Sequence, residues 1–377
     1  MNNQIYLDYG ATTPPRPEVI ELVCEVMQSE WGNPSSLHAW GERSAMIIER
    51  SRLQVAQLLN CDSSEIIFTS GGTEANNLAI FGTAWRYSTP QHLIISEVEH
   101  SAIAQPVEFL QSQGWQVTYL KVDQSGKVNP QDLIDSIRTN TVLVSIIYGQ
   151  NEVGTLQPIA ELSKICQAAQ IPFHTDAVQV VGKLPIDLEN LEVNFLSLSA
   201  HKFYGIQGIG ALFIKKGNVL APLLRGGGQE AGLRSGTQPI AAIARLGIAA
   251  ELAEKELVEE SLRLSDLRDR LFALLTDLPT LIPTGEMNNE RLPHHVSFCQ
   301  SLLNGREIVR KLNNLGIGIS SGSACSSGKI SPSPILLTLG FSEAEATGGI
   351  RITLGRDTTA ENINFTAKVL RQVFSKS

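Results

Sequence analysis

The 377-residue sequence predicts an α/β protein whose larger part is a mostly parallel, seven-stranded sheet with helices on both faces. Apolar runs of strand length alternate with stretches that carry apolar residues at helical spacing. The runs are nearly continuous and rich in β-branched residues, which is typical of strands buried on both sides. The predicted strands are Glu65–Thr69, His92–Ser96, Gln116–Leu120, Thr141–Tyr148, Ile171–Thr175, Asn194–Leu198 and Ala211–Ile214. Ligands bind beyond the carboxyl ends of such strands, so the residues after each run are the first candidates for a site.

The last third of the chain predicts a smaller α+β part. A helical pattern runs from Pro239 to about Asp277 and carries many charges, as expected of a helix that bridges two domains. Beyond it we expect strands and a closing helix at Val296–Cys299, Ile317–Ser320, Gly349–Leu354 and Glu361–Phe374. We therefore predict a large domain of residues 16–259 and a small domain of residues 1–15 and 260–377.

Composition excludes several classes of protein. With 30 Lys and Arg against 38 Asp and Glu, the net charge of -8 disfavours a protein that coats nucleic acid or a membrane surface. No stretch approaches the roughly 20 apolar residues of a membrane span, and the first residues lack the pattern of a signal peptide. We expect a cytoplasmic protein that binds neither nucleic acid nor membrane.

The five cysteines do not predict disulfides or a zinc site, because they are odd in number, widely spaced and without a C-x-x-C pair. Four of them, Cys24, Cys61, Cys166 and Cys299, have apolar or helical neighbours. Cys325 differs, because it lies in a segment of Gly, Ser and Ala, 320–328, that is too small and polar to be core. We expect a mobile loop whose exposed thiol is a nucleophile that delivers a group elsewhere, although an unreactive loop cysteine is the alternative.

Lys202 is the only Asp, Glu, Lys or Arg between Asn194 and Ile214, and it follows a predicted buried strand. Burial lowers the pKa of an ammonium group and makes the amine a nucleophile suited to Schiff-base chemistry. A lysine that extends from a strand end into water is the alternative.

Asp176 ends another predicted buried strand. A carboxylate there could bind a metal, orient a histidine, hold a pyridinium nitrogen, or cap the next helix. Gln179, three residues later, could face the same ligand. An Asp that keeps a pyridine ring protonated, together with a lysine Schiff base, indicates one particular cofactor chemistry.

The segment 70–77 follows a predicted strand and opens a helix, so Gly72 and Thr73 could bind a phosphate through backbone and hydroxyl groups. It has neither the lysine of a P-loop nor a G-x-G-x-x-G pattern, which disfavours nucleotide binding. An ordinary turn and helix cap is the alternative.

His100 follows the strand His92–Ser96 and could stack on an aromatic cofactor or move protons, or it could be a solvated loop residue. A metal site made of His100, His174, Asp176 and His201 is a further alternative, but no H-x-x-x-H spacing supports it. Arg351 lies among small and apolar neighbours, where its guanidinium requires an anion: a substrate carboxylate or a structural partner.

Together these residues resemble the cysteine desulfurases of the NifS/IscS type, within the pyridoxal-phosphate aminotransferase superfamily. The resemblance runs from Ile5 to about Arg371. It rests on the segments Tyr6–Pro14, Gly32–His38, Thr69–Asn77, Glu99-His100, Gln150–Gly154, His174–Gln179, Ser199–Gly205, Gly226–Glu230, Arg234–Thr237 and Ser321–Cys325, with Arg351. It implies the fold of type I pyridoxal-phosphate enzymes.

The resemblance also implies the site. Lys202 would attach pyridoxal 5′-phosphate and then shuttle protons, Asp176 would pair with the ring nitrogen, Gln179 with the ring hydroxyl, and His100 would stack on the ring. Thr73, Ser199 and His201 would bind the phosphate, with Thr237 reaching it from the partner subunit of a homodimer.

For the reaction, the resemblance implies that Asn151 and Arg351 bind the carboxylate of L-cysteine. Cys325 would take the sulfur as a persulfide, leave L-alanine, and pass the sulfur to an acceptor or an iron–sulfur scaffold protein. Four alternatives stay open: a selenocysteine lyase, a β-eliminating cysteine lyase, a zinc hydrolase, and a binding protein without catalysis.

Overall fold

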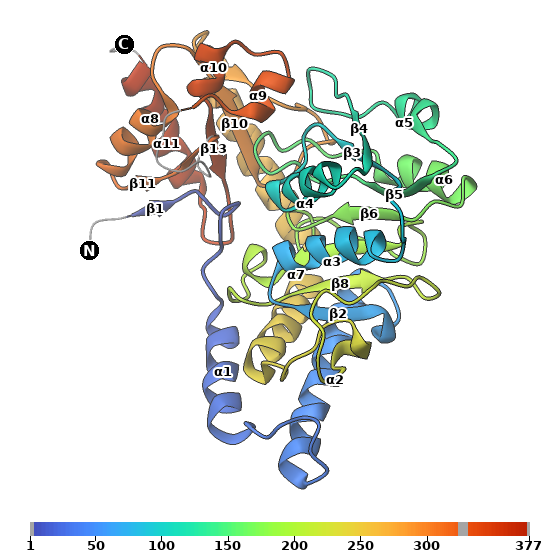
Figure 1. Cartoon of the computed structure of the whole chain (residues 1–377). Helices are drawn as coiled ribbons and strands as arrows, with labels where there is room; N and C mark the ends of the chain where they lie inside the picture. The colour runs from blue at the N-terminus through green and yellow to red at the C-terminus, as the bar shows by residue number, and fades with distance from the viewer. Residues whose placement is uncertain (1–3, 323–330, 375–377) are drawn as a thin grey trace.

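The seven predicted strands form one sheet in the computed structural model, which describes residues 4–322 and 331–374 (Figure 1). Their spatial order is β2 (Ile66–Thr69), β8 (Gly210–Ile214), β7 (Phe195–Ser199), β6 (Phe173–Asp176), β5 (Thr141–Ser145), β3 (His92–Ser96) and β4 (Gln116–Leu120). Neighbours from β7 to β4 are parallel, whereas β8 is antiparallel to both β7 and β2. The connection 200–209 explains this reversal, because a parallel crossover needs about a dozen residues or more. The predicted mostly parallel sheet is confirmed.

The two faces of this sheet are covered by different helices. Side chains alternate between faces along each strand, so Ile66 and Phe68 join one apolar core and Ile67 joins the other. The first core includes α2 (Ala39–Leu59), α6 (Ile159–Ala168) and the first half of α7 (Ile240–Leu275). The second includes α3 (Gly72–Ala84) and α4 (Ser101–Ser112). Helices α1 (Pro17–Ser29) and α5 (Pro130–Ser136) complete this part.

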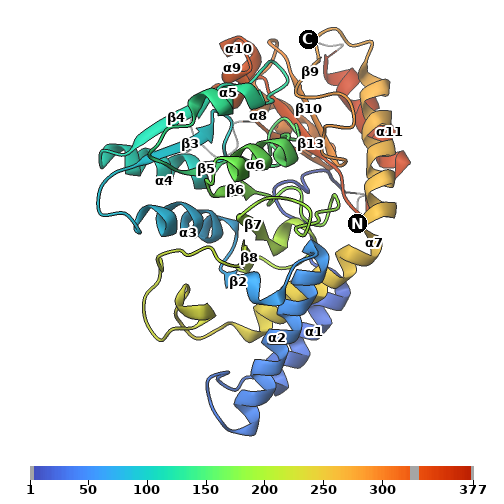
Figure 2. The same ribbon diagram turned by 90° about the vertical axis from the view of Figure 1, so that its right-hand side faces the viewer.

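The long helix predicted from Pro239 is confirmed as α7, and it joins two separate cores (Figures 1 and 2). Ile243 and Leu246 pack in the core of the main sheet, whereas Leu264 and Leu271 pack in the core of the C-terminal part. The predicted boundary between residues 259 and 260 falls inside this helix. Among the described residues, no helix combines the length and apolar character that crossing a membrane requires.

The C-terminal part contains two small sheets. One has the order β12 (Ser320–Ser321), β13 (Ile350–Thr353), β10 (His295–Cys299) and β9 (Ile282–Pro283), and the other pairs β1 (Ile5–Tyr6) with β11 (Ile317–Gly318). The helices here are α8 (Gly305–Asn313), α9 (Pro334–Thr338), α10 (Glu343–Thr347) and α11 (Ala360–Phe374). Ile5 and Leu7 lie in the same core as β10 and β13, so the chain begins in this part.

Two strand predictions need correction. The single strand predicted at Ile317–Ser320 is two strands, because residues 317–318 pair with β1 while residues 320–321 pair with β13. The strand predicted to reach Tyr148 ends at Ser145, although the Ile146 and Tyr148 amides still donate to carbonyls of β6. Apolar runs show where strands lie, but pairing partners decide where they end.

A buried ion pair fastens the loop 226–238 to the large part. The Glu230 side chain is 1% exposed and accepts two hydrogen bonds from the Arg52 guanidinium, at 2.8 and 3.0 Å. The same carboxylate accepts a hydrogen bond from the Phe68 amide at 2.8 Å. It therefore ties α2, β2 and the loop that carries Thr237 together.

Replacing Glu230 by alanine is expected to lower the free energy of unfolding by about 3–5 kcal/mol, because the buried Arg52 would lose its buried counter-ion. Urea unfolding followed by circular dichroism measures this change. The matched control is Glu49→Ala: Glu49 contacts Arg52 from the surface with 64% of its side chain exposed. Its removal should cost less than about 1 kcal/mol. If both variants lost the same free energy of unfolding, the buried ion pair would stabilise the protein no more than the surface contact does.

Candidate active site

A cavity of about 410 Å³ lies at the carboxyl ends of the parallel strands, where it meets the C-terminal part. Its size is within the usual range for small-molecule sites. Ten residues predicted from the sequence line it: Gly72, Thr73, His100, Asn151, Asp176, Gln179, Ser199, His201, Lys202 and Arg351. Thr237 is exposed and is not among the lining residues, and Cys325 lies outside the described residues. The cavity also contains residues that the sequence did not single out: Asp8, Gly10, Ala11, Asn76, Ile147 and Val178 among them.

Lys202 ends a short 3₁₀ turn, η2 (Ala200–Lys202), that directly follows β7. Its Nζ donates hydrogen bonds to the carbonyl oxygens of Gly10 at 2.7 Å and Ala11 at 2.9 Å. The residue is half-buried, between the buried amine and the solvent-exposed lysine that the sequence left open, because its amine reaches the cavity wall. The amine is therefore held at the cavity and is accessible to a ligand.

Asp176 is the last residue of β6 and is 4% exposed. Its Oδ1 accepts a hydrogen bond from the Val178 amide at 3.0 Å, and its Oδ2 accepts one from Asn76 Nδ2 at 2.6 Å. Both donors are neutral, and no ion pair found in residues 4–322 and 331–374 includes this carboxylate. A buried carboxylate without a counter-ion suits a cationic ligand such as a pyridinium nitrogen.

The N-terminus of α3 also lines the cavity. Gly71 precedes the helix with φ 152°, and a Cβ at Gly72 would lie 2.6 Å from Val178 Cγ2, so a side chain has no room there. Ser199 lies close by, since a Cβ at Gly71 would be 3.7 Å from its Oγ. Backbone amides at a helix start and a nearby hydroxyl suit a phosphate. The lysine, the unpaired aspartate and this anion site together fit pyridoxal 5′-phosphate.

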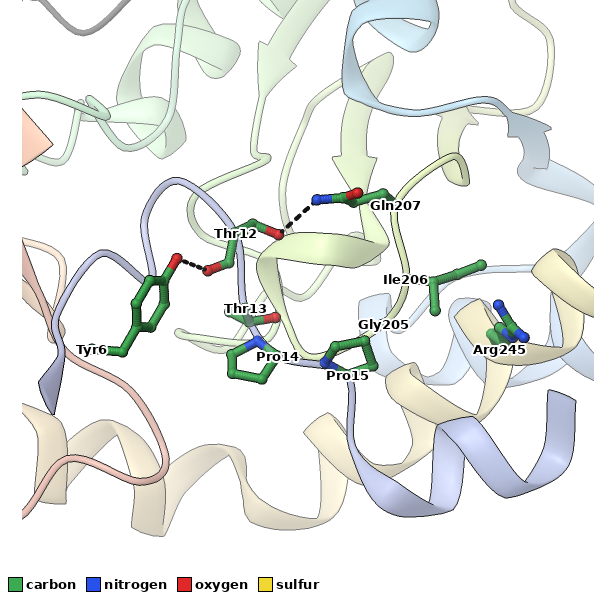
Figure 3. A pocket seen from close by; sticks show the side chains of 9 residues that line it. All are labelled: Tyr6, Thr12, Thr13, Pro14, Pro15, Gly205, Ile206, Gln207 and Arg245. Carbon is green, nitrogen blue, oxygen red and sulfur yellow. Dashed lines mark hydrogen bonds between the residues drawn. The ribbon is translucent and has the colours of Figure 1, made fainter. Parts of the chain in front are cut away.

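His201 lies beside the N-terminal segment that contains Thr12. It lines the cavity, and its Nδ1 is 3.2 Å from Thr12 Oγ1. Burial, and secondarily the Lys202 charge, lower the pKa of His201 to about 4, so the imidazole is neutral at pH 7. Figure 3 shows Thr12 in a second pocket of about 590 Å³, which it lines with Tyr6, Gln207 and Arg245. Residues 10–11 line the first cavity and residues 12–15 line the second, and the Thr12 contact helps to position His201.

His100 is the N-cap of α4, with its Nδ1 accepting the Ala102 amide at 3.1 Å. This contact fixes the ring at the cavity edge, and leaves the ring face or Nε2 for a ligand. His174 is placed differently: it is fully buried between the Ser145 and Ser197 hydroxyls, at 2.8 and 3.0 Å. The metal set that combined these histidines is not assembled. Within the described residues, no group of three or more His, Cys, Asp or Glu could hold a metal ion.

Arg351 projects from β13 in the C-terminal part and lines the cavity opposite the strand ends. Its Nη1 donates to the Asn151 carbonyl oxygen at 3.0 Å, and its Nη2 donates to Asp8 Oδ1 at 2.9 Å. The arginine therefore unites three segments far apart in the sequence. Asp8 was missed as a site residue, although one signal was present: it is the single charge in the apolar run Ile5–Tyr9.

A second carboxyl group lies behind the cavity. Glu99, next to His100, is buried, and its Oε1 accepts hydrogen bonds from Ser96 Oγ at 2.5 Å and the Ile147 amide at 2.9 Å. Burial raises the pKa of Glu99 to about 8, with the hydrogen bonds opposing the shift and Asp176 adding to it. The group is therefore protonated in the folded protein at neutral pH.

Replacing Glu99 by glutamine is expected to stabilise the protein above pH 6. The pKa of Glu99 is about 8 in the folded protein, whereas its ordinary value is 4.5. The stability that protonated Glu99 contributes is therefore complete below pH 4.5 and is lost as pH rises toward 8. The loss is about 1.4 kcal/mol per pH unit in that window, and glutamine cannot ionise. Urea unfolding at pH 5 and pH 8 measures the loss, with Glu97→Gln, at an exposed position, as the control. If the free energy of unfolding changed equally with pH in wild type and in Glu99→Gln, the prediction would be contradicted.

Comparisons with known proteins agree with this geometry. The aminotransferase class-V family model matches residues 5–365. The cysteine desulfurase IscS of Dictyoglomus turgidum is 44% identical over 377 residues, covering 100% of this chain and 96% of that protein. A solved NifS-like protein superposes with a TM-score of 0.92 at 34% identity, covering 99% of this chain and 100% of that one. A solved structure of SspA in complex with cysteine gives a TM-score of 0.81 at 36% identity, covering 93% and 98%.

Proposed function

Because this chain belongs to the aminotransferase class-V family and is a pyridoxal-phosphate-dependent cysteine desulfurase, we propose that it moves the sulfur of L-cysteine onto Cys325 and leaves L-alanine. The observation that carries the proposal is the convergence at one cavity of Lys202, Asp176 and Arg351. Asp176 ends β6 and Lys202 directly follows the neighbouring parallel strand β7, whereas Arg351 comes from β13 in the four-stranded sheet. Amine, carboxylate and guanidinium can then act on one amino acid.

The bound cofactor supplies an electron sink for the bonds at the substrate Cα. Asp176 would keep the ring nitrogen protonated, Gln179 would bind the ring hydroxyl, and His100 would stack on the ring. Gly72, Thr73, Ser199 and His201 would hold the phosphate. Support comes from the buried, unpaired carboxylate of Asp176 and from the helix start at α3.

The substrate is positioned by Arg351 and Asn151, which bind its carboxylate, while Lys202 Nζ takes the proton from Cα and returns protons to carbon. The Cys325 thiolate attacks the substrate sulfur, so an S–S bond forms as the Cβ–S bond breaks. Protons added to the carbon chain complete L-alanine, and Cys325 retains the sulfur as a persulfide. Gly322, the last described residue before this cysteine, lines the cavity, which supports the assignment.

We propose further that the enzyme is a homodimer in which Thr237 reaches the phosphate of the partner's site. Thr237 is exposed and does not line the cavity of its own chain. The region of α1 and α2, which extends away from the main sheet in Figures 1 and 2, exposes large apolar side chains. They are Met27 (64%), Trp31 (68%), Leu37 (95%), Trp40 (49%) and Met46 (64%). Such apolar exposure is typical of an interaction surface.

A cytoplasmic location and a sulfur acceptor, such as an iron–sulfur scaffold protein, complete the proposal. Four cysteines among the described residues are unpaired: Cys24, Cys61, Cys166 and Cys299. Free thiols are typical of a reducing compartment.

The test is the identity of the products. Purified protein loaded with pyridoxal 5′-phosphate is incubated with L-cysteine and a thiol reductant, and alanine, pyruvate and sulfide are quantified together. Alanine and sulfide in equal amounts are expected. Pyruvate without alanine would instead identify a β-eliminating lyase and would remove Cys325 from the mechanism.

A further inference from the structure

Asp8 occupies an unusual place for an acidic residue. It follows β1 and lines the cavity, and its carboxylate forms a 2.9 Å ion pair with Arg351, the residue assigned to the substrate carboxylate. The two side chains are 22% and 12% exposed, so water screens the pair only in part. A carboxylate that binds Arg351 must therefore share the guanidinium with another negative charge.

The backbone holds Asp8 in this position from several sides. Asp8 forms a bridge with Thr353 on the strand of Arg351, and the Tyr6 hydroxyl is 3.0 Å from the Asp8 carbonyl oxygen and 2.9 Å from that of Thr12. Figure 3 shows the second of these contacts. Arg351 Nη1 is bound by the Asn151 carbonyl, whereas its buried Nε has no hydrogen-bond partner in the described part of the chain. Both terminal nitrogens are therefore occupied, Nη1 by the Asn151 carbonyl and Nη2 by Asp8, so a substrate carboxylate at this guanidinium lies beside the Asp8 charge.

We propose that Asp8 is a specificity-determining residue that admits α-amino acids and rejects carboxylates without an amino group. This inference rests on the proposed function, because it assigns Arg351 to the substrate carboxylate. A thiol carboxylate brings one negative charge beside Asp8 and is repelled. The zwitterion of cysteine brings an ammonium group two bonds from its carboxylate carbon, and this charge offsets the repulsion. Discrimination between like-charged and complementary ligands is a common way to obtain specificity.

The probe is 3-mercaptopropionate, which is L-cysteine without its amino group. Calorimetric titration into the holoenzyme measures its Kd, and steady-state kinetics measure kcat and KM for L-cysteine. In Asp8→Asn, which keeps the side-chain shape and an acceptor oxygen for Arg351, the Kd of 3-mercaptopropionate divided by the KM of L-cysteine should fall at least tenfold. Asp8→Glu, which keeps the charge, should bind 3-mercaptopropionate as weakly as wild type.

The control is Asp277→Asn, because Asp277 pairs with Arg371 on the surface, outside the cavity. It should leave both constants unchanged. A purely structural role would change the Kd of 3-mercaptopropionate and the KM of L-cysteine by the same factor in Asp8→Asn, and that result would overturn the inference. Tighter binding of 3-mercaptopropionate by Asp8→Glu, as in Asp8→Asn, would also overturn it. Calorimetry with 3-mercaptopropionate does not depend on turnover. A failure of alanine formation in wild type would thus refute the proposed function without deciding this result.

Discussion

Replacing Lys202 by alanine is expected to reduce alanine formation from L-cysteine at least about 1,000-fold, because a positioned proton-transfer group contributes roughly 10²–10⁴ to a rate. An effect in the upper half of that range is expected here, because Lys202 is assigned both the attachment of the cofactor and the transfer of the proton from the substrate Cα. Its amine is already held at the cavity wall by the Gly10 and Ala11 carbonyls. The rate is measured by quantifying alanine under saturating cofactor.

A second readout separates attachment from proton transfer. Borohydride reduction of the loaded wild-type protein should leave the cofactor covalently bound to the peptide that contains Lys202, and mass spectrometry should detect no such adduct in Lys202→Ala. Exposed Lys216 provides the control, since Lys216→Ala should keep both the rate and the adduct. More than a tenth of the wild-type rate in Lys202→Ala would exclude this lysine from the mechanism.

Replacing Cys325 by alanine is expected to lower alanine formation at least about 100-fold, because single nucleophile replacements remove most of the rate in covalent catalysis. Binding should survive, because the residues assigned to cofactor and substrate all lie elsewhere in the sequence. Cys325 follows the cavity-lining Gly322 by three residues, a span of at most about 11 Å of chain. The loss should therefore appear in kcat rather than in cofactor affinity.

Mass spectrometry after alkylation should find one extra sulfur on the Cys325 peptide of wild type treated with L-cysteine. Cys24, which is exposed on α1, is the matched control: Cys24→Ala should retain the rate and the modified Cys325 peptide. Alanine formed by Cys325→Ala at the wild-type rate would show that another group accepts the sulfur.

Much of the site could be predicted because its signals are local. Lys202 and Asp176 each follow an apolar strand, and the carboxyl ends of parallel strands meet at one edge whatever the details of packing. Gly72 and Thr73 are likewise adjacent in the sequence and lie at one helix start. For these residues, chain position and hydrophobic pattern were sufficient to predict their place at the sheet edge, whereas their roles are implied by the family resemblance.

Contacts between distant segments could not be predicted in this way. Asp8 and Arg351 are separated by 343 positions, and Asn76 is 100 positions from Asp176. Nothing in the local pattern around either partner specifies the other. The half-buried state of Lys202 is of the same kind, because it depends on the Gly10 and Ala11 carbonyls across the cavity.

By itself, the sequence determined where along the chain the seven main strands and the long helix α7 lie, and which residues follow the strands, because hydrophobic periodicity is a property of neighbouring residues. Only the tertiary structure decided that residues 317–321 divide between two sheets and that Arg351 is shared by Asp8 and Asn151. The pairing of strands and of charges depends on which backbone or charged group lies opposite in space. The packing of the whole chain determines which group that is.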